Sequence, residues 1–319
     1  MRFAKFTLAM LLLAAPAATY AQGAAAPATP SAPAAEPAAK PDYITPHISD
    51  GSKIDLPSLK LGENLTREVE LPKWAPVHIG PLTLDVSLTK HVVMLFVAGI
   101  LCMLTLISAA RSQARSAATG RPPRGLANAI ESMVLYMRNE IILPNVGHDG
   151  EKFVPFCLSL FFFILFCNLL GLIPYGSTAT SNISVNATLA IISFFVIEID
   201  GMFALGRGYI NTIVYWPHDM AFAIKAPITL IMTPVEIMGK FTKPLALTIR
   251  LFANMIAGHV VVLALISIIF TFASWFLMPA PVLAATGIML LEIFVAFLQA
   301  FVFCLLVAVF IGQIRESAH

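Results

Sequence analysis

Residues 243–259 read Lys-Pro-Leu-Ala-Leu-Thr-Ile-Arg-Leu-Phe-Ala-Asn-Met-Ile-Ala-Gly-His, and they place an arginine, Arg250, inside an apolar run of membrane length. A guanidinium at bilayer depth costs roughly 2.5–3.5 kcal/mol on insertion scales, so an intramembrane arginine marks a functional site by default. Arginine keeps its proton at physiological pH, which makes Arg250 a permanent positive charge. The alternative is an arginine that snorkels or pairs structurally within a helix bundle.

The composition around this stretch is that of a polytopic membrane protein. Hydrophobic residues make up 58% of the 319 residues, charged residues only 12%, and the mean hydropathy is +0.83. The basic residues do not gather on a soluble face, so we expect no nucleic-acid partner. The cysteines stand in apolar runs without metal-ligand spacing, and we interpret them as buried small hydrophobic residues rather than metal ligands: Cys102, Cys157, Cys167 and Cys304.

The N-terminal part of the chain is expected to lie outside the membrane domain. Residues 1–21 have the pattern of a secretory signal peptide, with a basic start, a short apolar run and small residues near Ala21. Residues 22–42 are almost all alanine and proline, which is typical of a disordered tether. Residues 43–85 are polar and proline-containing, and they predict an irregular external segment.

Residues 86–319 are predicted to form an all-α polytopic membrane domain that ends in a long tilted helical hairpin. An amphipathic surface helix is expected over residues 126–142, because apolar residues recur there at helical spacing while charges interrupt them. About five membrane-crossing helices are expected, near residues 91–110, 153–173, 187–205, 227–276 and 282–311. As one helix, the fourth run would reach ~75 Å. It therefore contains either two helices or one long, steeply tilted helix.

Basic residues indicate how these helices are oriented. They follow the first span as a cluster between Arg111 and Arg124, follow the third span at Arg207 and Lys225, and follow the last span at Arg315. Such connections favour the cytoplasmic side. The pattern therefore predicts an external N-terminus and a cytoplasmic C-terminus.

A row of polar residues follows one face of the fourth span. Its members are separated by four, three, seven and four residues, which keeps them aligned at 3.6 residues per turn: Glu236, Lys240, Lys243, Arg250 and Asn254. A polar stripe at membrane depth needs an aqueous cavity or a polar partner. The alternative is that this face packs on the rest of the bundle.

His259 faces a different environment, because nine residues rotate it to about the opposite side of the helix from Arg250. In the last span, Glu292 and Gln299 share one face. If the two helices form a hairpin, His259 and Glu292 meet at similar depth and can hold or pass one proton near neutral pH. Without the hairpin, His259 is equally well interpreted as a hydrogen-bonded core residue.

Polar residues at the two ends of the third span leave their roles open. Glu198 and Asp200, near its cytoplasmic end, can either line an access path or stabilise an interface. In the preceding external loop, Asn182, Ser184 and Asn186 can admit water, but the pattern favours turn residues.

The sequence resembles subunit a of the F-type ATP synthase, the stator subunit of its proton-translocating membrane sector. The resemblance covers about residues 85–315. It rests on Lys243-Pro244, Arg250-Leu251-Phe252, Asn254-Met255 and Ala257-Gly258, with support from Glu236 and from Leu298-Gln299-Ala300-Phe301. In that family the arginine faces the carboxylates of a rotating c-ring, and two offset half-channels reach the ring from opposite sides.

The resemblance implies roles for individual residues. Arg250 would be the essential arginine, and Glu236 would lie toward the cytoplasmic exit. The proton path would include Asn254, His259, Glu292 and Gln299. Independently of the resemblance, Glu198, Asp200 and Lys243 are candidates for an access path. Many bacterial members carry an acid at the position of His259 and a histidine at that of Glu292, an exchange that keeps one acid and one imidazole.

The resemblance also implies a location and partners. These are a bacterial inner membrane, the c-ring, the peripheral-stalk b subunits and the rest of the ATP synthase complex. No cofactor is implied. The chain has no Walker-type phosphate-binding loop, so we expect ATP chemistry to reside in partner subunits.

Two other classes of function are compatible with a polar membrane helix. A secondary transporter or ion channel could use the same row to bind an anion, but it would need internal repeats or broken helices around a midplane site. A membrane scaffold would use the charges for assembly alone, and would tolerate the loss of His259 and Glu292.

Overall fold

The computed structural model describes residues 51, 53–57, 66–72, 77–79, 82–84, 89–119, 125–147, 149–173, 178–214, 222–272 and 279–316. The expected signal peptide (residues 1–21) and tether (residues 22–42) lie outside the described residues.

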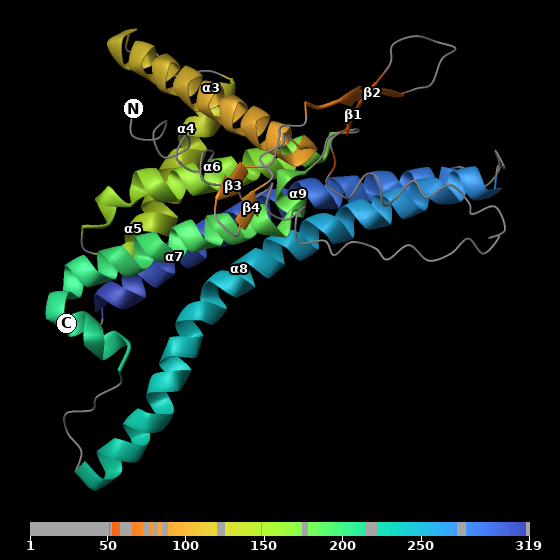
Figure 1. Cartoon of the computed structure of the whole chain (residues 1–319). Helices are drawn as coiled ribbons and strands as arrows, with labels where there is room; N and C mark the ends of the chain where they lie inside the picture. The colour runs from red at the N-terminus through yellow and green to blue at the C-terminus, as the bar shows by residue number, and fades with distance from the viewer. Residues whose placement is uncertain are drawn as a thin grey trace, which may run out of the picture.

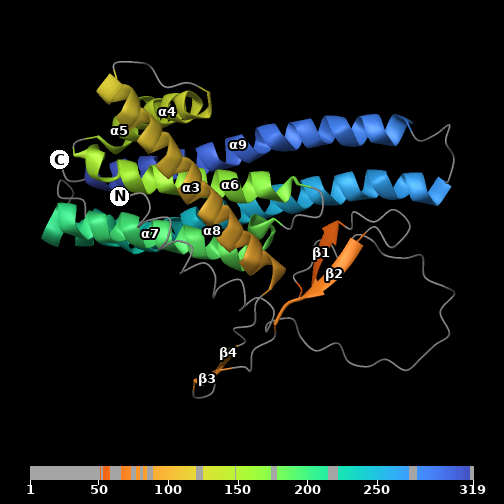
Figure 2. The ribbon, with the colours of Figure 1, turned by 90° about the horizontal axis from the view of Figure 1, so that it is seen from above.

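Among the described residues, five helices are long and apolar enough to cross a membrane, which confirms the predicted all-α polytopic class. They are α3 (Lys90–Thr119), α6 (Val154–Gly171), α7 (Ile183–Leu205), α8 (Phe222–Phe272) and α9 (Pro279–Glu316). α6 packs against α3 and α9, while α7 packs against α8 and α9. Figure 2 shows α3 crossing the bundle diagonally over these helices.

The core of the bundle is centred on α6. Its sequence is apolar on every side, and a helix of that kind is stable only when it is surrounded. Fourteen of its 18 residues are buried, including Ser159 and Asn168. The Ser159 hydroxyl donates to the carbonyl oxygen of Pro155 at 2.7 Å, so its polarity is satisfied within the helix.

Two short helices occupy the region where we expected one surface helix over residues 126–142, and a third follows it. α4 (Leu126–Tyr136) has no buried residue, in agreement with a position at the surface. It continues into the π-helix η1 (Met137–Ile142), which buries three apolar side chains, and then into α5 (Leu143–Val146). Ile130, Met133 and Val134 of α4 are partly buried against the core, whereas the three apolar side chains of η1 are buried within it.

The fourth span is a single helix, which decides between the two alternatives left open by the sequence. α8 is continuous over 51 residues although it contains Pro227, Pro234 and Pro244. Prolines bend helices without always ending them. In Figure 1, the N-terminal part of α8 curves away from the bundle, and its C-terminal part runs beside α9 to form the predicted hairpin.

The segment before α3 contains regular structure, whereas we expected irregular structure for residues 43–85. Its described residues form two antiparallel pairs: β1 (Lys53–Pro57) with β2 (Thr66–Glu70), and β3 (Val77–Ile79) with β4 (Leu82–Leu84). Apolar and polar residues alternate in β1, a period typical of strands, and Ile54 is paired with Val69. The backbone N–H of Lys90 donates to the carbonyl oxygen of Gly51 at 3.0 Å, which connects this segment to the start of α3.

Short 3₁₀ helices occupy three of the connections. η2 (Gly150–Lys152) precedes α6, and η3 (Ala179–Ser181) lies between α6 and α7. η4 (Gly206–Thr212) follows α7. η3 and η4 contribute side chains to the two polar regions described next.

Candidate functional site

Arg250 lies on α8 with its side chain exposed. Leu247, Leu251 and Met255 form the neighbouring face of the helix and are buried against the bundle. Within the part of the chain that the structure describes, no hydrogen bond or ion pair reaches the guanidinium of Arg250. Pairing inside the bundle, the structural alternative for this arginine, is therefore not observed among these residues.

His259 and Glu292 meet across the hairpin of α8 and α9. Their closest atoms, Nδ1 of His259 and Oε1 of Glu292, are 3.7 Å apart, and both side chains are mostly buried. The other ring nitrogen, Nε2, shares a hydrogen bond of 2.8 Å with the hydroxyl of Thr178, next to η3. The imidazole is thus held between a carboxylate and a hydroxyl, an arrangement that can exchange a proton at either ring nitrogen.

Gly258 makes room for the Glu292 carboxylate. A Cβ atom at residue 258 would collide with Oε1 of Glu292, whereas Gly239 on the same helix has open space around it. The carboxylate therefore lies directly against the backbone of α8. This close approach requires glycine at residue 258.

Buried amides and hydroxyls extend the region around His259. The Thr180 hydroxyl donates to Oδ1 of Asn168 at 2.7 Å, and Nδ2 of Asn168 donates to the carbonyl oxygen of Ala296 at 3.4 Å. Nδ2 of Asn186 donates to the carbonyl oxygen of Thr180 at 2.7 Å. The bonds join α6, η3, α7 and α9 at the depth of the His259–Glu292 pair.

Sequence reasoning missed Asn168, Thr178 and Thr180. The available signal was Asn168, an amide inside an otherwise apolar helix. Asn182 caps α7, because its Oδ1 accepts a hydrogen bond of 2.9 Å from the backbone N–H of Ser184. Among these loop residues, Asn186 instead belongs to the buried network.

The remaining amides of the predicted proton path follow Glu292 on α9 and Arg250 on α8. Gln299 is buried on α9, two turns beyond Glu292, and Asn254 is half-buried on α8, one turn beyond Arg250. Neither amide has a hydrogen bond to another residue in the described ranges.

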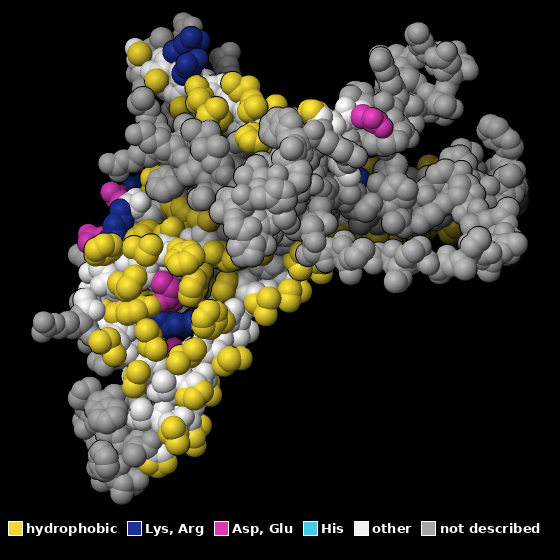
Figure 3. All heavy atoms as spheres, viewed as in Figure 1, with side chains coloured by type: hydrophobic (Ala, Val, Ile, Leu, Met, Phe, Trp, Pro, Cys, Tyr) yellow, Lys and Arg dark blue, Asp and Glu magenta, His cyan; other side chains and the backbone are white. Residues whose placement is uncertain are grey.

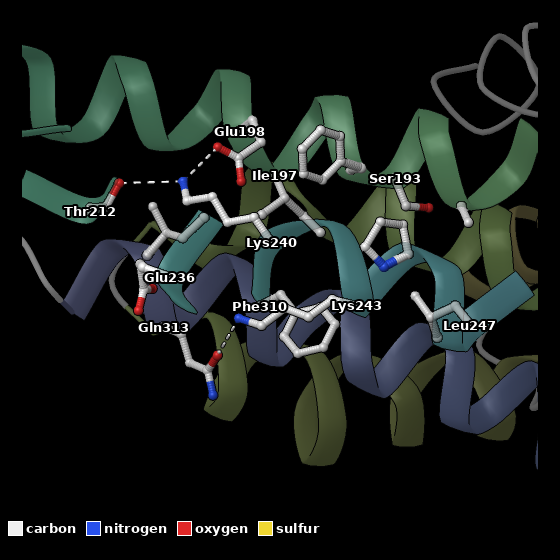
Figure 4. A pocket seen from close by; sticks show the side chains of 14 residues that line it. Ser193, Ile197, Glu198, Thr212, Glu236, Lys240, Lys243, Leu247, Phe310 and Gln313 are labelled. Atoms are coloured by element: carbon white, nitrogen blue, oxygen red, sulfur yellow. Dashed lines mark hydrogen bonds and ion pairs between the residues drawn. The ribbon is translucent and has the colours of Figure 1, made fainter. Parts of the chain in front are cut away.

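A second polar region surrounds a cavity of about 130 Å³ between α7, η4, α8 and α9. Figure 4 shows its polar lining, which consists of Ser193, Glu198, Thr212, Glu236, Lys240, Lys243 and Gln313. Nζ of Lys240 lies 2.9 Å from Oε2 of Glu198, and both side chains are mostly buried. In the space-filling view of Figure 3, charged side chains interrupt the hydrophobic surface near α7 and α8.

Asp200 has a different environment from Glu198, although only one residue separates them. Its carboxylate lies 3.3 Å from Nζ of Lys152 and 3.1 Å from Nε of Arg315. Asp200 does not line the cavity, and its ion pairs connect α7 to η2 and α9. Asp200 thus lies at a contact between helices, whereas Glu198 lines the cavity.

The polar row of α8 thus divides into two parts. Glu236, Lys240 and Lys243 line the cavity, while Arg250 and Asn254 lie farther along the helix. Within the described ranges, no group of three or more His, Cys, Asp or Glu side chains is placed to hold a metal ion. The four cysteines are buried and unpaired.

Fold and site together define a multi-pass, all-α membrane protein with an exposed arginine on one long helix, between two polar regions. The family model described as ATP synthase A chain matches residues 91–312. The chain therefore belongs to the ATP synthase subunit a family, which confirms the resemblance inferred from its sequence.

Similar proteins carry the same family name over most of their length. ATP synthase subunit a 2 of Chlorobaculum tepidum is 43% identical over 310 residues, which cover 96% of this chain and 80% of the relative. ATP synthase subunit a of Chloroherpeton thalassium is 42% identical over 268 residues, covering 84% and 74%. ATP synthase subunit a of Pelodictyon phaeoclathratiforme is 44% identical over 256 residues, covering 79% and 71%.

Proposed function

We propose that this chain is the proton-translocating subunit a of a rotary F-type ATP synthase, with ATP synthesis carried out by partner subunits. The observation that carries the proposal is Arg250, whose exposed guanidinium has no partner among the described residues and lies between two polar regions along α8. Family membership supports the same function. A charge so placed in the membrane needs a polar group from a second subunit.

That group is a carboxylate of the c-ring, in our proposal. At ~4 Å and an effective dielectric near 20, two opposite unit charges attract by ~4 kcal/mol. Arg250 therefore favours the ionised form of each ring carboxylate that approaches it, and the proton is released. Because arginine does not give up its own proton, it also prevents protons from leaking directly between the two sides.

Two offset half-channels bring protons to the ring and take them away. The external path uses Glu292, His259 and Gln299, with Asn254 near the ring. The cytoplasmic path uses the cavity, where Glu198, Glu236 and Lys243 line the walls. These assignments are supported by the contacts between His259 and Glu292 and by the charged lining of the cavity. Asp200 stabilises the helix ends instead, because both of its cationic partners lie outside the cavity.

The exposed surface of α8 provides a place for the ring. Large apolar side chains are exposed beside Arg250, among them Leu245 and Ile249, and suit either lipid or an apolar helix of a partner subunit. The peripheral-stalk b subunits complete the stator. We place the complex in a bacterial inner membrane, with the mature N-terminus in the periplasm and the C-terminus in the cytoplasm.

The first test is ATP-driven proton pumping in inverted membrane vesicles that carry Arg250→Ala. We expect pumping to be lost while the complex still assembles, and passive proton leak to increase. The matched control is Arg138→Ala, which removes an exposed arginine that is bonded to Glu151 at 2.8 Å. Unchanged pumping in Arg250→Ala would contradict the proposal and favour a transporter or a scaffold.

A further inference from the structure

Lys240 is held by three groups that belong to α7 and η4. Its Nζ lies 2.9 Å from Oε2 of Glu198, 3.2 Å from the hydroxyl of Tyr209 and 3.4 Å from the hydroxyl of Thr212. A lysine ammonium has three N–H donors, so this set can use all of them. The ammonium also lies 4.6 Å from the centre of the Tyr209 ring, a favourable cation–π distance.

The carboxylate of Glu198 is held by the same cluster. It accepts a hydrogen bond from the hydroxyl of Tyr209 as well as from Lys240. Mostly buried ion pairs pay a desolvation penalty that their attraction only partly recovers. Because of this penalty, the cluster contributes little to the stability of the bundle. A role in positioning the Lys240 side chain explains why these groups are placed together.

Glu236 lines the same cavity but is not bonded to this cluster. It lies one turn before Lys240 on α8 and is exposed. Glu followed by Lys four residues later is a favourable helical pair. Nevertheless, Glu236 has no hydrogen bond or ion pair with any residue that the structure describes.

The second lysine of the cavity makes its contacts with residues of α9. Nζ of Lys243 lies 3.3 Å from Oε1 of Gln313 and 4.6 Å from the centre of the Phe310 ring. Figure 4 shows the two ammonium groups pointing in these separate directions, Lys240 toward Glu198 and Thr212, and Lys243 toward Gln313.

We propose that Glu198, Tyr209 and Thr212 hold the ammonium of Lys240 away from Glu236, so that Glu236 is the carboxylate of the cavity that exchanges protons. This inference rests on the proposed function, and it adds positioning roles for Lys240, Tyr209 and Thr212. In it, Glu198 is a fixed counter-charge rather than a proton carrier. If Lys240 were released, it would pair with Glu236 and oppose its protonation.

The test measures the protonated fraction of Glu236 directly. A hydrophobic carbodiimide adds to a protonated carboxyl group and gives a stable N-acylurea, which peptide mass spectrometry assigns to a single residue. The assembled complex is labelled at one pH as wild type, Glu198→Gln, Lys240→Gln and the double variant Glu198→Gln/Lys240→Gln. Because labelling does not require pumping, a failure of this inference is separate from a failure of the proposed function.

We expect Glu198→Gln to lower the labelling of Glu236 by roughly fivefold, the effect of a new partly exposed ion pair. The double variant should return labelling to the wild-type level, because no lysine remains at residue 240 to pair with Glu236. If Glu198→Gln fails to assemble, Tyr209→Phe/Thr212→Val keeps both charges and should lower labelling in the same direction. Unchanged labelling in Glu198→Gln, or equal loss in the double variant, would overturn the proposal.

Discussion

Each of the two polar regions includes a close pair of one acidic and one basic side chain on neighbouring helices, but the pairs differ in what the basic group can do. In the cavity, Lys240 lies 2.9 Å from Glu198, and a lysine ammonium donates hydrogen bonds but accepts none. In the hairpin, His259 lies 3.7 Å from Glu292, and an imidazole can be neutral or charged near pH 7. In our proposal, the first pair holds a geometry and the second passes a proton. Two pairs that each combine a carboxylate with a basic side chain can therefore differ in function.

The largest expected effect comes from the charge that separates the two regions. Replacing Arg250 with glutamine removes an attraction of ~4 kcal/mol, so ATP-driven pumping should fall by roughly a thousandfold. Arg250→Lys should lose nearly as much, because a lysine in this place can give up its proton. Pumping per assembled complex is the measurement. Substantial activity in Arg250→Lys would show that any cation suffices.

The next effect tests whether the His259–Glu292 pair passes a proton. Glu292→Gln should slow pumping by about 100-fold, which is within the range for loss of a proton-transfer group. The exchange His259→Glu/Glu292→His keeps one acid and one imidazole, so it should recover most of the rate. The same exchange of charges in the cavity, Glu198→Lys/Lys240→Glu, should not, because it places a second carboxylate one turn from Glu236 on α8. Equal recovery of pumping in the two double variants would show that the two pairs do not differ in this way.

A smaller effect is expected from crowding the hairpin pair without changing its chemistry. Gly258→Ala puts a methyl group where Oε1 of Glu292 lies, so the carboxylate must move away from His259. We expect pumping to fall about fivefold, in line with the cost of modest overpacking. Gly239→Ala is the matched control on the same helix, since nothing lies within 4 Å of the new methyl group. A normal rate in Gly258→Ala would mean that the separation of 3.7 Å is not critical.

The smallest effect on pumping is expected at Asp200. Asp200→Asn removes the charge that faces Lys152 and Arg315, so the thermal stability of the complex should fall by about 1 kcal/mol. Pumping per assembled complex should change by less than about twofold, because these ion pairs lie outside the cavity. Thermal unfolding and pumping of one preparation separate the two quantities. A rate loss as large as that of Glu292→Gln would return Asp200 to the proton path.

Much of the fold could be predicted because apolar runs of membrane length are recognised directly in the sequence. The hairpin that brings His259 to Glu292 followed from two adjacent runs joined by a short connection. The continuity of α8 did not follow, because three prolines are compatible with either a bend or a break. The two strand pairs before α3 were also not predicted, since short alternating stretches among prolines carry a weak signal.

The candidate site was predictable where a charge stands at membrane depth, and not where neutral groups cooperate. Arg250 and Glu292 are costly in lipid and therefore conspicuous. Thr178 and Asn168 are ordinary in a sequence, and only their contacts with His259 and Ala296 reveal them. Those contacts join residues 81 and 128 positions apart, a separation that no local pattern encodes.

α8 also has a mechanical consequence. The helix is about 76 Å long at ~1.5 Å per residue, and Arg250 lies near its middle. Near Arg250, Leu247, Leu251 and Met255 are buried against the bundle. The N-terminal part of α8 extends away from the bundle. A rod held at one point deflects most at its far end and least where it is held. We therefore expect a sideways force on the N-terminal part of α8 to bend that part of the helix and to leave the guanidinium of Arg250 in place.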